Sequence, residues 1–437
     1  MIPQTRTVDG VSRMMAFMKK LMRDKRGNAL IIAAGALPLV IGSAGLASDT
    51  IQWTLWKRQL QRAADSAALA AVYDRIANDG STGNVSAAVT DDLGRHNHTN
   101  IALLSGYPQL AYPSGTNWTN PVRVTLALQK RLGFSSVFLN SPPVITTQAT
   151  AATVATGVYC VVSLVDTAAT GIKATGNGDI NLGCGMITNS TSLTAAIATG
   201  SSEVNATPVA AVGDIQDSDN WGGAELLPFT VKQADPFADV NVPSFSPCQG
   251  NANRLRVLSN ATDNSHAADT GVVCVSEMDL NGDVTLGSAT YVIDGGDFSV
   301  GAQAHVTCNG CTIILTNSDT STTPTIGTVD INGGAEIDMS APTTGTYDNI
   351  LFYQDRRAEE STTIVNTING NSDSLFSGAF YFPNQQLQIN GTAGLNMNCA
   401  QFVSYVIEFA GNGSINNTCT GGYGDDRIMG QHVRLVA

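Results

Sequence analysis

An uncharged stretch of nineteen residues, Ala29–Ala47, constrains this chain more than any other feature. It has about the length that a helix needs to cross a bilayer, roughly 20 residues. Basic residues precede it, and none follows it until Lys57, which predicts a cytoplasmic N-terminus at 1–28, a membrane span at 29–48 and an exported remainder. The preceding basic residues include Arg13, Lys19, Lys20, Arg23, Lys25 and Arg26.

A cleaved signal peptide is the alternative interpretation of the same stretch. Gly45-Leu46-Ala47 has the small residues of a cleavage site. The apolar run is longer than the usual signal-peptide core of about 7–15 residues, which favours a retained anchor.

The charge distribution agrees with an exported body. Up to Arg62 the chain has ten basic and three acidic residues, a net charge of +7, whereas the remainder has 13 basic and 33 acidic residues, a net charge of −20. An acidic body repels phosphate backbones, so we expect no nucleic acid as partner. At 437 residues, two or three domains are expected.

The segment after the span predicts a long helix at 50–78, because Ala, Leu, Gln and Arg dominate and Gly80 is the first breaker. Trp53 and Trp56 follow the apolar run, where interfacial aromatic residues sit. A stripe of small apolar residues then recurs at helical spacing, which suits packing on a sheet or on a neighbouring helix. Its members are Leu60, Ala64, Ala67, Ala68 and Ala71.

The order of these N-terminal motifs resembles the signature of Tad (tight adherence, Flp-type) pilus-assembly proteins, of the TadG-like group with a TadE/G-like N-terminal region. The motifs are Arg26–Ala29, the apolar run, Gly45–Asp49 and Leu60–Ala71. Processed pilin-like members carry a glutamate five residues after the cleaved glycine. Ile32 stands there in this chain, which favours a retained anchor.

Residues 49–156 are expected to form a pilin-like α+β unit, with the long helix packed on a small sheet. Val85–Leu93 suits a short helix, and Val122–Leu128 alternates as a strand should. Val144–Val154 is a second strand candidate, separated from the first by a turn at Pro142-Pro143.

From Gly157 onward, short apolar runs recur every seven to ten residues between Asn-Gly, Gly-Gly and Asp-Gly corners. Three such strands per coil predict a mainly-β right-handed parallel β-helix. A meander of hairpins is the alternative, because Asn-Gly is also a good hairpin turn. We expect two β-helix blocks, 157–215 and 276–437, with a loop or linker insertion at 216–275. Leu351–Arg356 and Gly378–Pro383 resemble segments that recur in TadG-like β-helix proteins.

Eight cysteines all follow the span, and an even number outside the cytoplasm favours disulfides over metal ligation. Three sequential spacings are close to one β-helix coil, so residues one coil apart would stack within bonding reach. The fourth pair would close the Asn309-Gly310 turn. The expected pairs are Cys160–Cys184, Cys248–Cys274, Cys308–Cys311 and Cys399–Cys419.

Other candidate sites are weaker, and we expect no catalytic site, cofactor or metal. Asp166–Thr170 lacks the serine of a D-x-S-x-S metal motif, and Asp279–Asp283 is followed by Val284 and Thr290 where a calcium loop needs Gly and Glu. The five histidines have no ligand spacing; they are His96, His98, His266, His305 and His432. A carbohydrate-active enzyme would need carboxylates on one face; candidate groups are Asp294, Asp297, Asp338, Asp355, Arg356 and Arg357.

The resemblance implies a single-pass inner-membrane protein of a Tad pilus, with its bulk in the periplasm or outside the cell. Its expected role is assembly, or tip or surface interaction in adherence, rather than catalysis. The implied partners are other Tad pilus or secretion components, the inner membrane, and surface glycans or pilin subunits. A carbohydrate-active β-helix lyase or hydrolase and a secreted β-helix adhesin are the alternatives.

Overall fold

The computed structural model describes residues 15–16, 19–20, 28–78, 80–95, 101–391, 394–419 and 428–436. The chain forms two compact units. Residues 1–152 and 434–437 make the N-terminal unit, and residues 153–433 make the C-terminal unit. Each unit is described by itself.

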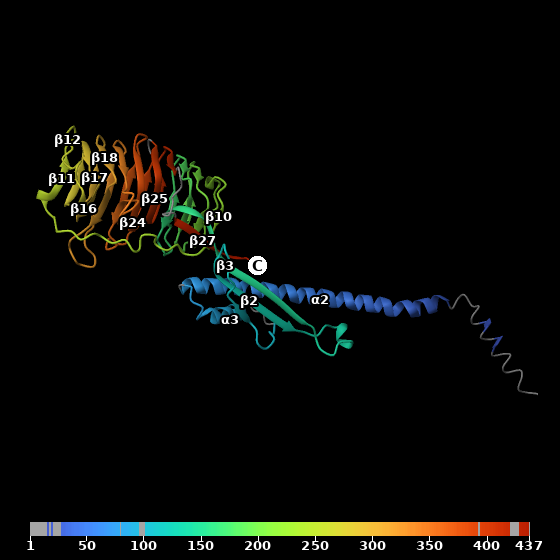
Figure 1. Ribbon diagram of the computed structural model, residues 1–437. Helices are drawn as coiled ribbons and strands as arrows, with labels where there is room; N and C mark the ends of the chain where they lie inside the picture. The colour runs from blue at the N-terminus through green and yellow to red at the C-terminus, as the bar shows by residue number, and fades with distance from the viewer. Residues whose placement is uncertain are drawn as a thin grey trace, which may run out of the picture. The chain divides into compact units, whose positions relative to one another are not determined.

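A single long helix, α2 (Asn28–Ala77), dominates the N-terminal unit (Figure 1). It includes Pro38 and continues without a break from the apolar run into the amphipathic segment. Most side chains from Ile31 to Ser48 are exposed, and burial begins at Asp49. The long N-terminal apolar helix expected from the sequence is therefore confirmed; its composition and length suit a membrane span.

The remaining elements of the N-terminal unit cover the second half of α2. Strand β1 (Gln109–Ala111) pairs antiparallel with β2 (Thr119–Gln129), and β2 pairs in turn with β3 (Val144–Ser163). Helix α3 (Val85–Arg95) packs on α2 through Val85 and Val89. The connection between β2 and β3 carries one turn of 3₁₀ helix, η1 (Ser135–Val137).

The C-terminal unit is mostly β structure. After β3 it contains β4 (Ile172–Ala174), β5 (Ile180–Asn181), β6 (Gly185–Thr188), β7 (Ala196–Ala198), β8 (Val204–Asn205), β9 (Val209–Ala211), β10 (Leu226–Leu227), β11 (Arg254–Val257), β12 (Thr262–Asp263), β13 (Gly271–Val275), β14 (Glu277–Leu280), β15 (Asp283–Leu286), β16 (Ala289–Asp294), β17 (Phe298–Val300), β18 (His305–Asn309), β19 (Thr312–Thr316), β20 (Val329–Ile331), β21 (Glu336–Ser340), β22 (Ile350–Gln354), β23 (Val365–Asn369), β24 (Leu375–Asn390), β25 (Leu395–Ala410), β26 (Ile415–Thr418) and β27 (Ile428–Leu435). The unit also has 3₁₀ turns η2 (Asp219–Trp221) and η3 (Asn251–Asn253).

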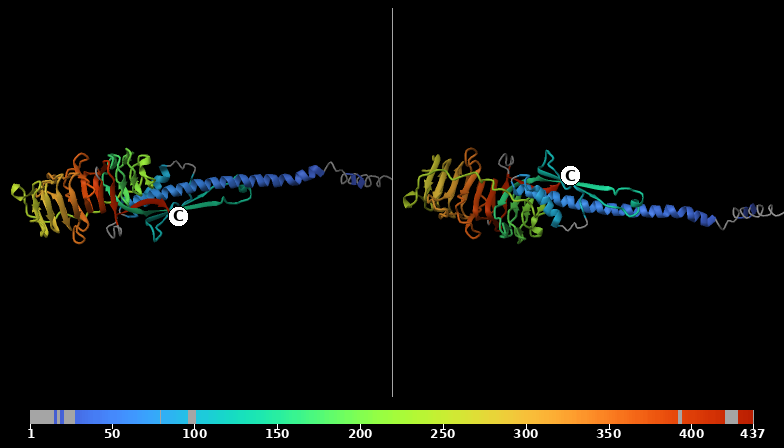
Figure 2. Two further views of the ribbon diagram at one scale, coloured as in Figure 1. Left: turned by 90° about the horizontal axis from the view of Figure 1, so that it is seen from above. Right: turned by 90° about the horizontal axis from the view of Figure 1, so that it is seen from below.

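These strands pair in parallel with a regular offset of three. Strand β11 pairs with β14, β14 with β17 and β17 with β20, and the rows that start at β12 and β13 follow the same rule. Figure 2 shows the strands stacked side by side along the unit. The expected mostly β domain with parallel strands is thus confirmed. Strands β24 and β25 are 16 residues long, however, because each continues through the corners and contributes to several rows.

Aromatic side chains line the interior of this parallel stack and connect successive layers. The rings of Phe298, Phe352, Phe380 and Phe402 come from successive layers, with centroids 5.4, 5.4 and 5.3 Å apart. The Phe402 ring also contacts Phe409 of the same strand, at 6.0 Å. All five are fully buried. Burying such large apolar surfaces is the main stabilising contribution to a stack of short strands.

The two expected blocks belong to one continuous stack. Along this stack the late block comes first and the early block follows it, because the last strands of the late block pair with the first strands of the early block. The late strand β25 pairs with the early strands β3 and β4, and β26 pairs with β5. In Figure 1 the orange and red β24 and β25 accordingly lie beside the green early strands. Asn181 Nδ2 donates to Asn416 Oδ1 across this junction, over 3.0 Å.

The segment expected as a loop at 216–275 contains two different structures. Residues 254–275 form β11, β12 and β13, which pair with β14, β15 and β16 and so belong to the stack. Residues 228–250, which we call the strap, leave β10 and reach β11 with no strand of their own. Because β10 pairs with β9 in the early block, while β11 pairs with β14 in the late block, the strap connects the two ends of the stack.

Candidate functional site

The small-residue stripe of α2 is a packing surface against β2 and α3. Its five members have no exposed surface, and neither do the adjacent Ala63 and Val72: the stripe is Leu60, Ala64, Ala67, Ala68 and Ala71. Alanines allow the helix backbone to approach the sheet closely, where a larger side chain would force the elements apart. Both surfaces expected from the sequence, a sheet and a neighbouring helix, are thus supplied within this chain by β2 and α3.

Polar residues of the same motif fix the helix against its neighbours. Gln61 Nε2 donates to the side chain of Asp65 at 2.7 Å and to the carbonyl of Gln148 on β3 at 3.0 Å. Ser66 Oγ donates to Asp92 Oδ1 on α3 at 3.0 Å. These side-chain hydrogen bonds to two different elements determine how α2 is rotated on the unit.

The Gly45–Asp49 motif contacts the connection between β2 and β3. The Asp49 carboxylate accepts hydrogen bonds from the backbone N–H of Phe134 at 2.9 Å and from both the N–H and the hydroxyl of Ser135. Gly45 faces the Phe134 ring so closely that a Cβ there would lie 2.3 Å from Phe134 Cδ2. Glycine and aspartate at this spacing therefore hold the end of the hairpin against the helix.

The eight cysteines form four disulfides in the C-terminal unit: Cys160–Cys184, Cys248–Cys274, Cys308–Cys311 and Cys399–Cys419. Two of them join neighbouring layers. Cys160 and Cys184 lie beside the paired residues of β3 and β6, and Cys399 and Cys419 lie beside those of β25 and β26. Cys308–Cys311 closes the turn between β18 and β19. Cys248–Cys274 differs from the stacked arrangement, since it ties the strap to β13.

The strap is held to the stack by side chains from the two segments that resemble TadG-like sequences. Arg356 donates to the carbonyl groups of Val240 and Phe237, and the Tyr381 hydroxyl donates to Asp235 Oδ2 at 2.7 Å. The Tyr353 hydroxyl also donates to the Val240 carbonyl, at 2.7 Å. Arg356, one of the candidate catalytic groups, therefore has a structural partner in the strap.

Asp294 and Asp355 lie on one row of the stack, two layers apart. Asp294 is in register with Thr316 of the next layer, and Thr316 Oγ1 donates to Asp355 Oδ2 at 2.7 Å. Asp294 also accepts hydrogen bonds from the N–H groups of Cys248 and Ser318, and Asp355 accepts them from Arg357. Both carboxylates are thus engaged with protein donors.

The electrostatics of these two carboxylates do not suit a general acid. Burial opposes ionisation of Asp355, but hydrogen bonds from Arg357 and Thr316 hold the pKa of its carboxyl below the ordinary value. Burial likewise opposes ionisation of Asp294, but hydrogen bonds from Ser318, Cys248 and Gln249 lower the pKa of that carboxyl. Because the acid of a glycosidase needs a raised pKa, this pair fits turn stabilisation better than glycoside cleavage.

The other candidate groups are dispersed over the C-terminal unit. Asp297 accepts from the Thr328 N–H, and Asp338 is exposed on β21. Asp166 pairs with Lys232 over 2.9 Å. In the segment that resembles a calcium loop, the Asp279 carboxylate already accepts hydrogen bonds from Arg254 and Asn281 of the same unit.

The three histidines that the structure describes are not brought together either. His266 contacts Asp269, His305 lies 3.6 Å from Glu336, and His432 lies near Thr230. His96 and His98 fall outside the described residues.

One grouping of potential metal ligands occurs in the described parts of the chain: Cys248, Cys274 and Asp294. The two sulfur atoms are joined to each other in a disulfide, which removes the thiolates that a metal would need. The Asp294 carboxylate is hydrogen-bonded to the Cys248 backbone instead. This cluster is therefore suited to holding the end of the strap.

Sequence reasoning missed the partners of Gly45 and Asp49 and the role of the strap. Neither Phe134 nor Ser135 carries a motif that marks it. The segments with Tyr353 and Tyr381 are marked only by the family resemblance, and Arg356 is marked by it and as a candidate catalytic group, not as a contact of the strap.

Comparison with known protein families finds a match in the N-terminal part of the chain. Residues 27–77 match the family model Tad, described as putative Flp pilus-assembly TadE/G-like. No curated protein and no solved structure matches the chain. The matched residues coincide with α2 and include Gly45, Asp49 and the buried alanine stripe, so the chain carries a TadE/G-like domain of the Flp pilus-assembly type at residues 27–77.

Proposed function

We propose that this chain is a single-pass inner-membrane component of a Tad pilus, with α2 as a retained anchor. The proposal has the N-terminus in the cytoplasm and the acidic body on the opposite side of the membrane. The TadE/G-like match over residues 27–77 is the observation that carries it. Support also comes from the exposed apolar surface of α2 between Ile31 and Ser48 and from the basic residues that precede it.

The N-terminal unit, in this proposal, is a pilin-like module. A long helix whose C-terminal half packs on a small antiparallel sheet supports this interpretation, as does the use of the family motif in that packing. Fold analogy alone says little about activity. The family motif residues Gly45 and Asp49 and the small-residue stripe, which all take part in this packing, support the pilin-like interpretation more specifically.

The body is proposed to be a right-handed parallel β-helix. The offset-of-three parallel pairing, the continuous apolar interior and the short strands between glycine-containing corners all support this architecture. The boundary at residue 157 remains a proposal. The segment that leaves the coil is proposed to be the strap rather than the whole of 216–275, because β10 pairs with β9, and β11, β12 and β13 pair with β14, β15 and β16.

The proposed role of the body is assembly, or tip or surface interaction, during adherence. The Tad family favours a structural role over catalysis and implies other pilus components as partners. Pilin subunits and surface glycans are the proposed contacts beyond them. A carbohydrate-active enzyme is less favoured, because Asp294 and Asp355 are held as hydrogen-bonded carboxylates.

Deletion of the gene in its own cell tests this proposal. We expect loss of surface pili and of adherence, with both restored by the wild-type chain. A variant with Leu39→Arg and Ile41→Arg should fail to restore them, because charges in the middle of a span cost roughly 2.5–3.5 kcal/mol each. Leu193→Ser, an exposed position of the body, is the control and should restore both. Normal piliation and adherence in the deletion strain would contradict an assembly role.

A further inference from the structure

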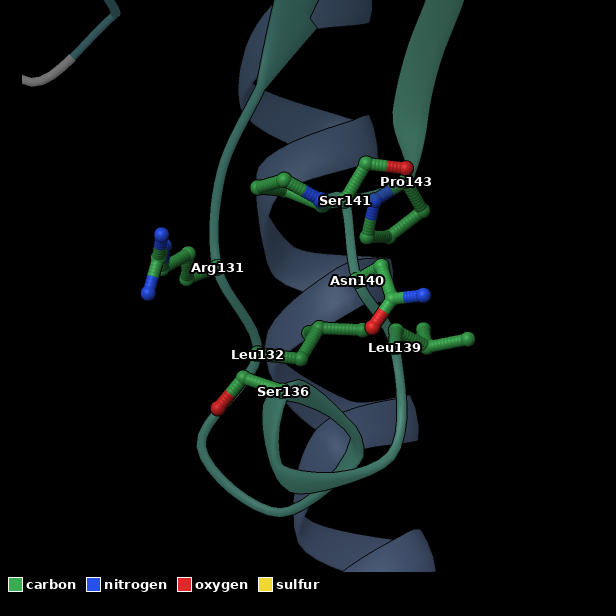
Figure 3. A pocket seen from close by; sticks show the side chains of 8 residues that line it. Arg131, Leu132, Ser136, Leu139, Asn140, Ser141 and Pro143 are labelled. Atoms are coloured by element: carbon green, nitrogen blue, oxygen red, sulfur yellow. The ribbon is translucent and has the colours of Figure 1, made fainter.

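The end of the β2–β3 hairpin, residues 131–143, exposes an unusual run of apolar side chains. We call this segment the hairpin tip. Val137, Phe138 and Leu139 are consecutive and expose 77%, 72% and 50% of their surfaces. Such a run is unfavourable in water, and it typically marks a surface that meets an apolar partner. Figure 3 shows the tip lying beside α2, with Arg131 projecting away from the helix.

The tip is fixed at one level of α2. Asp49 accepts the hydrogen bonds of Phe134 and Ser135, and the Phe134 ring lies against Gly45. Gly45 belongs to the uncharged stretch at 29–47, which is the proposed span. The apolar run of the tip thus begins beside the non-cytoplasmic end of that span.

Aromatic and basic side chains lie beyond the Gly45 level of α2, on the side away from the proposed span. Lys57 lies over the Trp53 ring at 5.4 Å, and Lys130, next to the tip, lies over the Trp56 ring at 5.2 Å. Trp53 is eight residues beyond Gly45, which is about 12 Å along a helix. Tryptophan with lysine or arginine is the combination found where a protein meets lipid headgroups.

We propose that the hairpin tip inserts Val137, Phe138 and Leu139 into the non-cytoplasmic leaflet of the bilayer that α2 crosses. The occupant of this surface is lipid: acyl chains contact the three apolar residues, while Lys130 and Arg131 lie at the headgroup phosphates. The anchor and the tip together give the N-terminal unit two attachments to the membrane and so restrict its orientation there. The inference rests on the proposed anchoring of α2.

A second copy of the chain is the other apolar partner to consider. The position of the tip favours lipid, because its apolar residues continue the apolar surface of α2 at the same end of the span. Lipid also accounts for the neighbouring Trp53, Trp56 and Lys130, which are residue types that sit at lipid headgroups, whereas a protein partner gives them no such role.

Site-specific fluorescence distinguishes these possibilities in the full chain. All eight native cysteines are in disulfides, so one added thiol can be labelled under non-reducing conditions. The variants are Phe138→Cys in the tip, Leu39→Cys within the span and Ser81→Cys as an exposed control. Each is labelled with an environment-sensitive dye and reconstituted into vesicles of equal parts phosphatidylcholine and phosphatidylglycerol. Nitroxide-labelled lipid then reports contact with acyl chains, and iodide reports contact with water.

We expect the label at position 138 to emit at shorter wavelength than the label at 81, to lose fluorescence with nitroxide lipid and to resist iodide. Equal iodide quenching at 138 and 81, with the label at 39 still quenched by nitroxide lipid, would overturn the inference and leave the anchor intact. Protection at 138 from both quenchers would overturn it in favour of a protein contact. Loss of nitroxide quenching at 39 would overturn the anchor first, and the inference with it.

Discussion

The Asp49 carboxylate makes two hydrogen bonds with Ser135: its Oδ2 accepts from both the backbone N–H and the side-chain hydroxyl of Ser135. The two residues are 86 positions apart in the chain. This contact connects the TadE/G-like motif of α2 to the hairpin tip, and it gives the aspartate of that motif a structural purpose. Charge-assisted hydrogen bonds to backbone N–H groups are among the stronger polar contacts in proteins.

Replacing Asp49 by Ala should release the hairpin tip from α2. The N–H groups of Phe134 and Ser135 would lose their acceptor, so their amide hydrogens should exchange faster with solvent. Hydrogen exchange with mass spectrometry measures this, and Thr50→Ala is the control, because the Thr50 hydroxyl bonds only within α2, to Leu46. Unchanged exchange in the tip of the Asp49 variant would show that the contact is dispensable.

Replacing Gly45 by Ala should displace the Phe134 ring, since the added Cβ would lie 2.3 Å from Phe134 Cδ2. Overpacking of this kind typically costs about 1–3 kcal/mol. Gly42→Ala is the matched control on the same helix, because no atom lies within 4 Å of a Cβ there. Limited proteolysis of the purified chain should cut the tip faster in the first variant only. Equal cutting in both variants would refute a specific role for Gly45.

Non-reducing peptide mapping should find four links, in chain order: Cys160–Cys184, Cys248–Cys274, Cys308–Cys311 and Cys399–Cys419. The test is demanding, because β25 and β3 are adjacent and Cys160 Sγ lies 3.8 Å from Asn417 Nδ2. A link between Cys160 of the early strands and either cysteine of the Cys399–Cys419 pair would contradict the assignment.

The link between the strap and β13 should be important for stability. Changing Cys248 and Cys274 to Ser opens a loop of 26 residues, which by chain entropy costs about 3 kcal/mol. The Cys308/Cys311 double serine variant is the control, because its loop spans only three residues and should cost less. Chemical denaturation compares the two; an equal loss in both would argue against loop closure as the cause.

The stability of the stack should depend on ionised Asp355. Its lowered folded pKa means that the stabilising contribution is complete above the ordinary aspartate value of about 4 and is lost as the pH falls through the lower folded value. Asp355→Asn should reduce the free energy of unfolding by about 2 kcal/mol at neutral pH, through hydrogen bonds to a charged partner. The difference from wild type should shrink in acid.

Asp338→Asn is the matched control for that measurement, because Asp338 is exposed and should change the free energy of unfolding by no more than about 0.5 kcal/mol. A constant difference between wild type and Asp355→Asn from neutral to acid pH would contradict the ionic role of Asp355.

Local sequence patterns predicted the helices and the presence of short strands. The segment after Ser48, which has no glycine or proline before Gly80, is helical as far as Ala77, and the alternating residues from Val122 to Leu128 lie in β2. Both features depend on neighbouring residues in the chain, which is where propensity and periodicity carry information.

The order of layers in the stack could not be predicted, because it depends on pairing between distant segments. Nothing local shows that Phe402 of β25 lies in register with Val161 of β3. Strand β11 was missed for another reason: its alternation of arginine with apolar residues spans only four residues, Arg254–Val257, which is too short to predict a strand. The two arginine side chains pair with Glu277 and Asp279 on the next layer. The partner of Asp49 was equally hidden, since Ser135 lies in a turn with no motif.

Membrane fractionation combined with alkaline carbonate extraction tests most directly whether α2 is a retained anchor that carries the body. We predict that the full-length chain stays in the inner-membrane pellet after carbonate treatment, and that protease added to spheroplasts digests the body. A soluble periplasmic product beginning at Ser48 or Asp49 would contradict it.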